Sequence, residues 1–267
     1  MLRLFAAVAW VVAPCAGKAA SSISSELWYL NEALAARSLH DPFVLSLGSG
    51  ALPRPAFAAY VAQDAFFLRA FAAAYDAAIG KCGDEPAGVA DRCARDLAIL
   101  RGAVADELEL HGSYAKKWGA ELDGPGFAPT PATARYVAFL GDVAGSAETS
   151  AAAVVAAMAP CMVLYNEIGV ALASAGAADA SNPYAEWVET YASAAFSGAR
   201  KTIDDLLDAL AAAAEDEDRH DKVGAVPRLY AEALRLEKAF FAAQALSPTH
   251  EADNAAFLHR LTGRREL

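Results

Sequence analysis

The sequence of 267 residues predicts an all-α protein that folds as a single helical bundle domain. Alanine, the residue with the highest helix propensity, is abundant throughout the chain. Leu, Phe and Tyr recur at spacings of three and four residues, which places them on one face of a helix. The alternation of Val, Ile and Thr that is typical of strands is nearly absent. With no internal repeat and no long linker, we expect one domain over residues 21–267.

The N-terminal residues 1–20 have the pattern of a cleaved signal sequence. Arg3 precedes an uncharged run over residues 4–17, and Gly17 and Ala19 supply the small residues of a cleavage site. The run is short for a membrane span, which needs about 20 apolar residues. We therefore expect entry into the secretory pathway and no stable membrane span after removal of the leader. A bipartite leader that ends in a plastid is the alternative.

The first helices follow from apolar periodicity and from turn residues. A helix is expected from Ser24 to Leu39, and Gly48 and Gly50 indicate that residues 40–53 interrupt the helical pattern.

The next expected helix spans residues 54–79 and has a broad apolar stripe, which Asp64 interrupts. Because burying a lone carboxylate is costly, Asp64 must either face a polar ligand or pair with a donor inside the protein.

Two cysteines flank the connection to the following helix, which ends near Trp118. Cys82 and Cys93 could form a disulfide in an oxidising compartment, although the sequence does not show their Cα separation. Cys161 would then be an unpaired thiol.

The remaining helices are predicted by the same periodicity, over residues 133–144, 147–173, 183–196, 198–214 and 229–241. The segment 147–173 is the most apolar of these, which predicts a central buried helix, and Pro160 should kink it. The segment 183–196 carries an aromatic face of Tyr184, Trp187, Tyr191 and Phe196.

The net charge of -11 and the pI near 4.9 make the surface acidic, with no extended basic cluster. An acidic surface repels the phosphate backbone, so we expect no nucleic-acid partner.

Cys161 and Tyr165 stand one turn apart on the central apolar helix. Cysteine is a nucleophile only where its surroundings lower its pKa or supply a base, and a lone cysteine is more often a small buried apolar residue. Glu237, flanked by Leu234 and Phe240, is either a carboxylic acid with a raised pKa or a glutamate at the edge that faces water. The residues alone leave both choices open.

Glu107 and His111 have the i, i+4 spacing of a helical metal-ligand pair. A di-iron site would need a Glu-x-x-His element on each of two helices, and no such element recurs among five histidines. We therefore expect no metal, and a structural or supporting role for this pair.

Several ordered motifs resemble those of the TenA/thiaminase II family. They are HDPFVLSLGSGALPRPAFAAYVAQDAFFLRAF, ELELH, PCMVLYNEIG, YAEWVETYAS and LEKAFF, and together they cover roughly residues 25–245. The resemblance, to the cysteine-containing type, implies a haem-oxygenase-like helical bundle with a pocket between helices. It implies neither haem nor metal nor another cofactor, and it implies a homo-oligomer.

The functional residues of the family match positions in this chain. The aspartate that binds the aminopyrimidine matches Asp64, the nucleophilic cysteine matches Cys161, and the carboxylate of the penultimate core helix matches Glu237. The aromatic residues around the substrate match Phe67, Tyr136, Tyr165 and Tyr191.

The implied activity is that of an aminopyrimidine aminohydrolase in thiamine salvage. This enzyme converts 4-amino-5-aminomethyl-2-methylpyrimidine to hydroxymethylpyrimidine and ammonia through a cysteine adduct. A formylaminopyrimidine deformylase or a thiamine-cleaving thiaminase on the same site are the alternatives. A non-catalytic pyrimidine-binding protein is less expected, because such a protein needs no nucleophile at Cys161.

Overall fold

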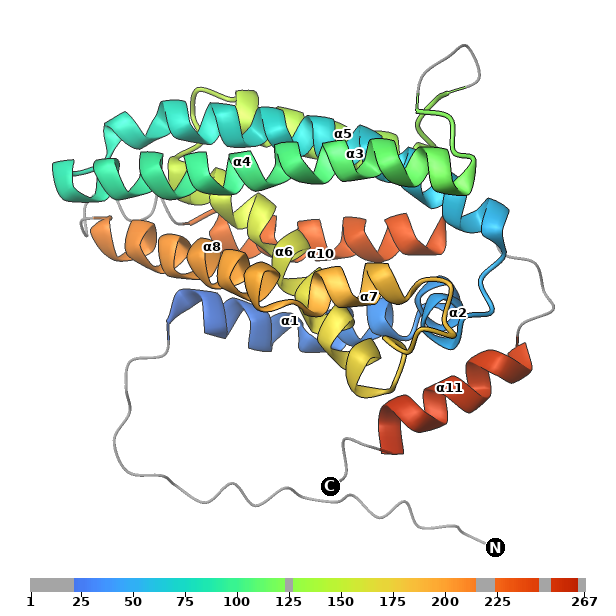
Figure 1. The fold of residues 1–267 in the computed structure, drawn as a ribbon. Coiled ribbons are helices and arrows are strands. Elements are labelled where there is room, and N and C mark those ends of the chain that lie inside the picture. The colour runs from blue at the N-terminus through green and yellow to red at the C-terminus, as the bar shows by residue number, and fades with distance from the viewer. Residues whose placement is uncertain (1–21, 123–126, 215–223, 245–250, 264–267) are drawn as a thin grey trace, which may run out of the picture.

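The computed structural model describes residues 22–122, 127–214, 224–244 and 251–263. Every regular element in these ranges is a helix (Figure 1). The helices are α1 (Ile23–Leu39), α2 (Pro42–Ser49), α3 (Arg54–Lys81), the short 3₁₀ helix η1 (Cys82–Asp84), α4 (Ala87–Trp118), α5 (Pro131–Gly145), α6 (Ala151–Ser174), α7 (Ala185–Ala192), α8 (Ala194–Ala213), α10 (Val226–Ala242) and α11 (Glu251–Gly263). The predicted all-α class is confirmed. The leader predicted for residues 1–20 lies outside the described residues.

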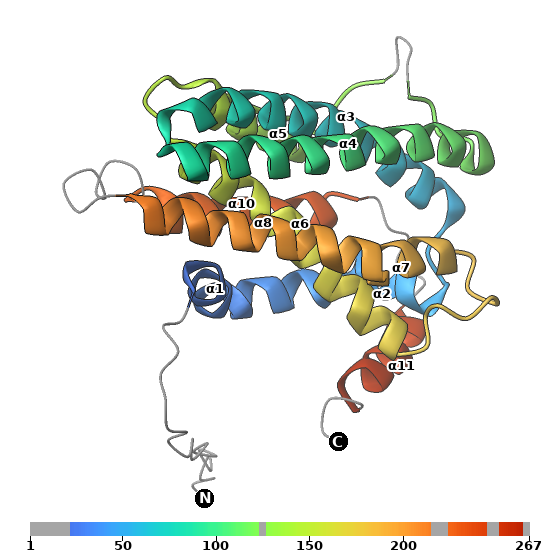
Figure 2. The same ribbon diagram turned by 60° about the vertical axis from the view of Figure 1, so that its left-hand side comes forward.

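Figures 1 and 2 show α3, α4 and α5 along one side of the bundle and α1 along the opposite side, with α8 and α10 between them, one on each side of α6. α3 packs against α4 and α5, and α1 packs against α10 and α8. α6 crosses the bundle obliquely and contacts α10, α7 and α8. α11 lies at the outside of the bundle, where it packs against α2.

The sequence of α6 explains its central position. The side chain of Ser150 caps the helix by accepting a hydrogen bond from the backbone N–H of Ala153. From Ala151 to Leu172 almost every residue is buried, as expected for a helix that is apolar on all sides. α6 is the one helix in the described part of the chain that is long and apolar enough to cross a membrane, and 83% of its most apolar window is buried inside the protein.

A disulfide joins η1, which directly follows α3, to the first turns of α4. Cys82 and Cys93 are bonded, with their Cα atoms 5.7 Å apart, as their positions in the sequence allowed. Closing a loop of this length stabilises the folded state by about 3 kcal/mol, because the bond restricts the unfolded chain. Cys161 is the free cysteine among the described residues.

The interruption predicted over residues 40–53 is wrong in part, because this segment contains α2. Asp41 caps the helix by accepting from the N–H of Phe43, and Gly50 ends it with a φ of 79°. Both signals are visible in the sequence. The helix between Asp41 and Gly50 has only 8 residues, however, and in so short a segment Gly48 and Gly50 suggested a loop.

Two other helix boundaries also differ from the sequence prediction. The helix predicted over residues 183–196 is divided into α7 and α8, since the side chain of Ser193 accepts from the N–H of Phe196 and starts a new helix. Similarly, α6 begins after its cap at Ser150 rather than at residue 147. α11 was not predicted at all.

Gly169 sets the distance between α6 and α7. A Cβ atom at this position would lie 2.6 Å from the carbonyl carbon of Tyr191, which is closer than real contacts allow. One turn earlier, the Nδ2 atom of Asn166 donates to the carbonyl oxygen of Tyr191 at 2.9 Å. The absence of a side chain at residue 169 and this hydrogen bond together hold Tyr191 against α6.

We expect Gly169→Ala to destabilise the protein by about 1–3 kcal/mol, because the added methyl group forces the α7 backbone away from α6. Gly141→Ala is the matched control, since a Cβ atom on Gly141 meets nothing within 4 Å. This control should leave stability unchanged or raise it by about 0.5–1 kcal/mol. Urea unfolding of both variants provides the test, and equal stabilities would contradict the role given to Gly169.

Candidate active site

A cavity of about 310 Å³ lies between α3, α4, α6 and the α7–α8 junction. α3 contributes Asp64 and Phe67 to its wall, α6 contributes Cys161 and Tyr165, and α7 contributes Tyr191. Its remaining wall is mostly apolar and comes largely from α4 and α8. Five of the seven residues proposed from the sequence therefore share one cavity.

Glu237 and Tyr136, the other two, do not line this cavity. The Tyr136 hydroxyl donates to Oε1 of Glu237 at 2.8 Å, and the carboxyl group also shares a hydrogen bond with the thiol of Cys161. Glu237 is 1% exposed. It thus lies behind the wall and reaches the cavity through Cys161.

Burial raises the pKa of Glu237 to about 8, and the charge of Asp64 adds to the rise, although the hydrogen bonds from Tyr136 and Cys161 oppose it. A large fraction of Glu237 therefore carries a proton at neutral pH. The glutamate that faces water, one of the two readings of its sequence, is excluded.

Burial, followed by the negative charges of Glu237 and Asp64, raises the pKa of the Cys161 thiol well above its usual range. The resting thiol is therefore protonated, and it becomes nucleophilic only when a base removes its proton. Glu237 is the hydrogen-bonded group in position to do so.

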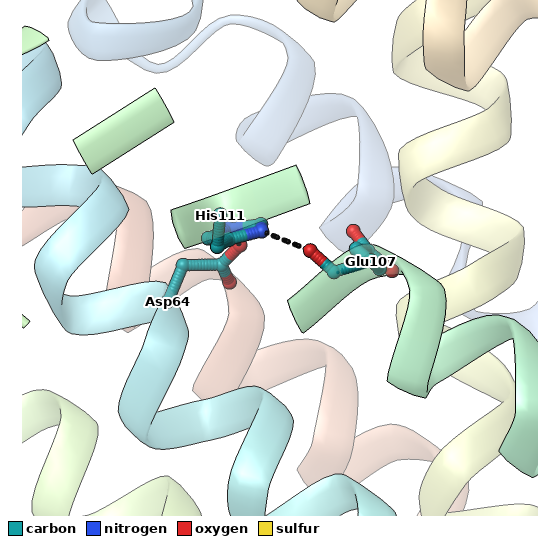
Figure 3. A group of neighbouring side chains, drawn as sticks. All are labelled: Asp64, Glu107 and His111. Atoms are coloured by element: carbon teal, nitrogen blue, oxygen red, sulfur yellow. Dashed lines mark hydrogen bonds and ion pairs between the residues drawn. The ribbon is translucent and has the colours of Figure 1, made fainter. Parts of the chain in front are cut away.

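Asp64 is 3% exposed, and its Oδ2 atom lies 2.8 Å from Nε2 of His111. The other ring nitrogen of His111 lies 2.9 Å from the backbone oxygen of Glu107. Figure 3 shows this cluster, with Asp64 on α3 and the other two residues on α4. Burial alone would lower the pKa of His111, but the hydrogen bond and charge of Asp64 raise it to about 9. Asp64 therefore has an internal donor, a histidinium, and it also lines the cavity, where it can face a polar ligand.

Asp64, Glu107 and His111 each offer one ligand atom, and these atoms lie within 4.8 Å of one another. Both ring nitrogens of His111 are already engaged in hydrogen bonds, one to a carboxylate and one to a backbone carbonyl. The contacts seen here are those of a hydrogen-bonded cluster.

The sequence did not predict the place of Glu107 in the cavity wall or a chain of hydrogen bonds between aromatic residues. Glu107 lines the cavity and accepts from the Tyr191 hydroxyl at 2.6 Å, whereas helical spacing had suggested only its pairing with His111. The indole N–H of Trp187 donates to Tyr60 at 3.2 Å, and Tyr60 donates to Tyr165 at 3.4 Å. Nothing in the sequence connects these aromatic residues, because they belong to three helices.

Residues 31–247 match the model of the TENA/THI-4/PQQC family. The chain belongs to this family. It is 31% identical over 243 residues to the "Bifunctional TH2 protein, mitochondrial" of Arabidopsis thaliana, covering 85% of this chain and 38% of that protein. It is 28% identical over 170 residues to an aminopyrimidine aminohydrolase of Halalkalibacterium halodurans, covering 63% of this chain and 73% of that protein.

Solved structures of other TenA proteins have the same fold. A TenA family transcription regulator from a Silicibacter species is 26% identical and superposes with a TM-score of 0.69, over 81% of this chain and 93% of that one. A TenA homologue from Pyrococcus furiosus, 20% identical, has a TM-score of 0.69 over 82% of this chain and 97% of that one.

The chain spans well under half of the Arabidopsis relative, which is a longer protein.

The buried ionisable groups predict how stability depends on pH. The pKa of Glu237 rises from 4.5 to about 8 on folding and that of His111 from 6.5 to about 9, so the folded state binds both protons more tightly. Their stabilising contributions are complete below pH 4.5 and 6.5 respectively, and are lost as pH rises through about 8 and about 9.

We therefore expect the free energy of unfolding to fall as pH increases from 5 to 9, and Glu237→Gln to reduce this slope. Urea titrations at several pH values measure both. The same slope in the variant and in the parent protein would show that Glu237 does not bind its proton more tightly on folding.

Proposed function

We propose that this TenA-family protein is a hydrolase of the aminopyrimidine aminohydrolase type, which acts on an aminomethyl pyrimidine and releases hydroxymethylpyrimidine and ammonia. One observation carries the proposal: Cys161 and Asp64 face the same cavity, and Cys161 is hydrogen-bonded to a carboxyl group with a raised pKa. Relatives from Halalkalibacterium halodurans and Bacillus subtilis bear the name of this activity, at 28% and 29% identity.

The reaction begins with removal of the thiol proton of Cys161 by the carboxylate form of Glu237. The thiolate adds to the ring carbon next to the one that bears the aminomethyl group. The electron pair displaced through the ring expels the amine, to which Glu237 returns the proton. Water then adds to the exocyclic methylene, the thiolate leaves, and hydroxymethylpyrimidine is formed.

Recognition of the flat ring requires an anchor and a stacking surface. The Asp64 carboxylate is held in place by His111 and accepts hydrogen bonds from the amino group of the ring. Tyr165 and Tyr191 pack edge to face with centroids 4.9 Å apart, and Phe67 lines the same cavity. These rings would enclose a pyrimidine between apolar faces.

The alternative leaving groups, a formylamine or the thiazole of thiamine, would use the same anchor, Asp64, and the same thiol, Cys161.

A pyrimidine-binding protein without catalysis would need neither a nucleophile nor a proton acceptor beside it. The hydrogen bond between Cys161 and Glu237 therefore favours an enzyme.

We also propose the compartment in which the protein works. The signal sequence predicted for residues 1–20 would bring the chain into an oxidising compartment, and the Cys82–Cys93 disulfide is the bond expected there. A bipartite leader to a plastid remains the alternative. Assembly into a homo-oligomer, implied by the family resemblance, is also proposed.

Cys161→Ser should lower the rate of ammonia release from the aminomethyl pyrimidine by at least about a hundredfold, because the nucleophile is lost while the side-chain volume hardly changes. Coupled detection of ammonia with purified protein gives the rate, and thiamine is compared as a second substrate. Circular dichroism controls for folding. Near-parental turnover by the folded variant would overturn the mechanism.

Glu237→Gln should slow turnover of the aminomethyl pyrimidine by roughly a hundredfold to ten-thousandfold, because glutamine cannot transfer a proton. The thiazolium of thiamine leaves without protonation, so the loss on thiamine should be smaller. The two substrates are compared in pre-steady-state measurements of the leaving-group step. Equal losses on both would exclude Glu237 as the acid that protonates the amine.

A further inference from the structure

The cavity is larger than the pyrimidine that the proposed function places in it. Its volume is about 310 Å³. For comparison, an apolar cavity of about 150 Å³ in another protein holds one benzene molecule. The pyrimidine with its methyl, amino and methylene groups is about one and a half times the size of benzene, so roughly a third of the cavity is left over. This space is available to the group that the reaction removes.

The two ends of the cavity differ in polarity. α3 and α4 lie side by side and run in opposite directions (Figures 1 and 2). Phe71 stands about 10 Å beyond Asp64 along α3, and Leu100 stands about 10 Å before Glu107 along α4, since each pair is two helical turns apart. Because the helices are antiparallel, Phe71 and Leu100 line one end of the cavity, and the two acidic residues line the other.

The end away from Asp64, here called the apolar end, is lined by Phe71, Leu100, Val104, Met162 and Ala199. The sulfur atom of Met162 accepts from the hydroxyl of Tyr75 at 3.2 Å, one turn beyond Phe71. α8, which carries Ala199, runs from the α7 junction along α4 toward the same end (Figures 1 and 2). All acidic side chains in the described wall lie about two turns from Phe71 or Leu100. An apolar wall stabilises no charge, so its occupant must be neutral.

The thiol of Cys161 lies between the anchor and the apolar end. Tyr165, one turn after Cys161 on α6, accepts a hydrogen bond from Tyr60, which is one turn before Asp64 on α3. Met162, the next residue after Cys161, belongs to the apolar end. A ring that is held by Asp64 and attacked by Cys161 therefore has the apolar end within reach of its leaving group.

We infer that the apolar end of the cavity binds a short acyl chain on the aminomethyl nitrogen, so that N-alkanoyl derivatives of the aminomethyl pyrimidine are substrates. This inference rests on the proposed function and extends it to leaving groups longer than a formylamine. The nitrogen of an amide is uncharged at neutral pH, as the apolar end requires. Its alkyl chain is stabilised by removal from water against the apolar wall.

The residues of the proposed mechanism complete this reaction. The proton of the Cys161 thiol passes to Glu237, and a carbon–sulfur bond forms. The bond between the methylene carbon and the amide nitrogen then breaks with its electron pair, and Glu237 gives its proton to that nitrogen. Water adds to the methylene, and the thiol regains a proton as it leaves. One carboxamide and one hydroxymethylpyrimidine are formed from the substrate and water, without an oxidant or a reductant.

The test measures binding by calorimetry in a Cys161→Ser background, which prevents turnover. The probes are 4-amino-5-aminomethyl-2-methylpyrimidine and its N-formyl, N-acetyl and N-butanoyl derivatives. Affinity should rise about threefold with each added carbon of the chain, so that the butanoyl probe binds about tenfold to fiftyfold more tightly than the formyl probe.

Variants on α8 locate the binding site of the chain. Ala199→Leu narrows the apolar end and should bring the butanoyl probe to within about threefold of the formyl probe, while binding of the formyl probe changes less than about threefold. Ala199→Val should remove a smaller part of the gain. Ala212→Leu places the same side chain at an exposed position of α8 that does not line the cavity, and should affect no probe. Thermal unfolding confirms that each variant is folded.

The possible outcomes separate this inference from the function on which it rests. If the probes bind but affinity does not rise from formyl to butanoyl, the acyl site is overturned and the pyrimidine site stands. A gain that persists in Ala199→Leu as it does in Ala212→Leu also overturns it, because the chain then lies elsewhere. If no probe binds the background protein, the proposed function and the inference fail together. A gain with chain length that Ala199→Leu removes supports both.

Discussion

The site depends on how an apolar helical bundle accommodates negative charge. Asp64 stands on a face of α3 that is otherwise apolar, and it is nearly inaccessible to solvent. His111 compensates the carboxylate from α4, and both of its ring nitrogens are engaged, so the ring has one orientation. The same two helices are joined at their other end by the Cys82–Cys93 disulfide. An anchor for a polar ring is thereby held rigidly in an apolar wall.

The surroundings of Glu237, a second buried carboxylate, have the opposite effect on its protonation. Glu237 has hydroxyl and thiol neighbours instead of a cation, so burial raises its pKa and keeps much of it protonated. One carboxylate is thus suited to binding and the other to proton transfer, although both are buried. The thiol of Cys161 lies between Glu237 and the cavity, which makes its reactivity depend on that carboxyl group.

Close packing around α6 allows these distant groups to meet. Gly169 lets the α7 backbone approach, and Asn166 holds the carbonyl of Tyr191, so an aromatic residue from the next helix reaches the wall. The break at Ser193 then turns the chain into α8, which forms the outer wall with α4. Gly169 and Asn166 on the buried helix α6 therefore shape the site indirectly, because they fix the position of α7.

The sequence by itself determined the helical class, the approximate extent of the long helices, the candidate disulfide and the need of Asp64 for either a polar ligand or an internal donor. These follow from local periodicity, from the positions of the cysteines and from the cost of burying a charge. It did not predict α11, and it read α2 as a loop. Only the tertiary structure decided that Tyr136 supports Glu237 from behind the wall, that Glu107 faces the cavity, and that Cys161 shares a hydrogen bond with a residue on α10. Helical periodicity states which residues share a face of one helix. Which faces meet depends on the packing of helices far apart in the chain, and that packing is a property of the whole bundle.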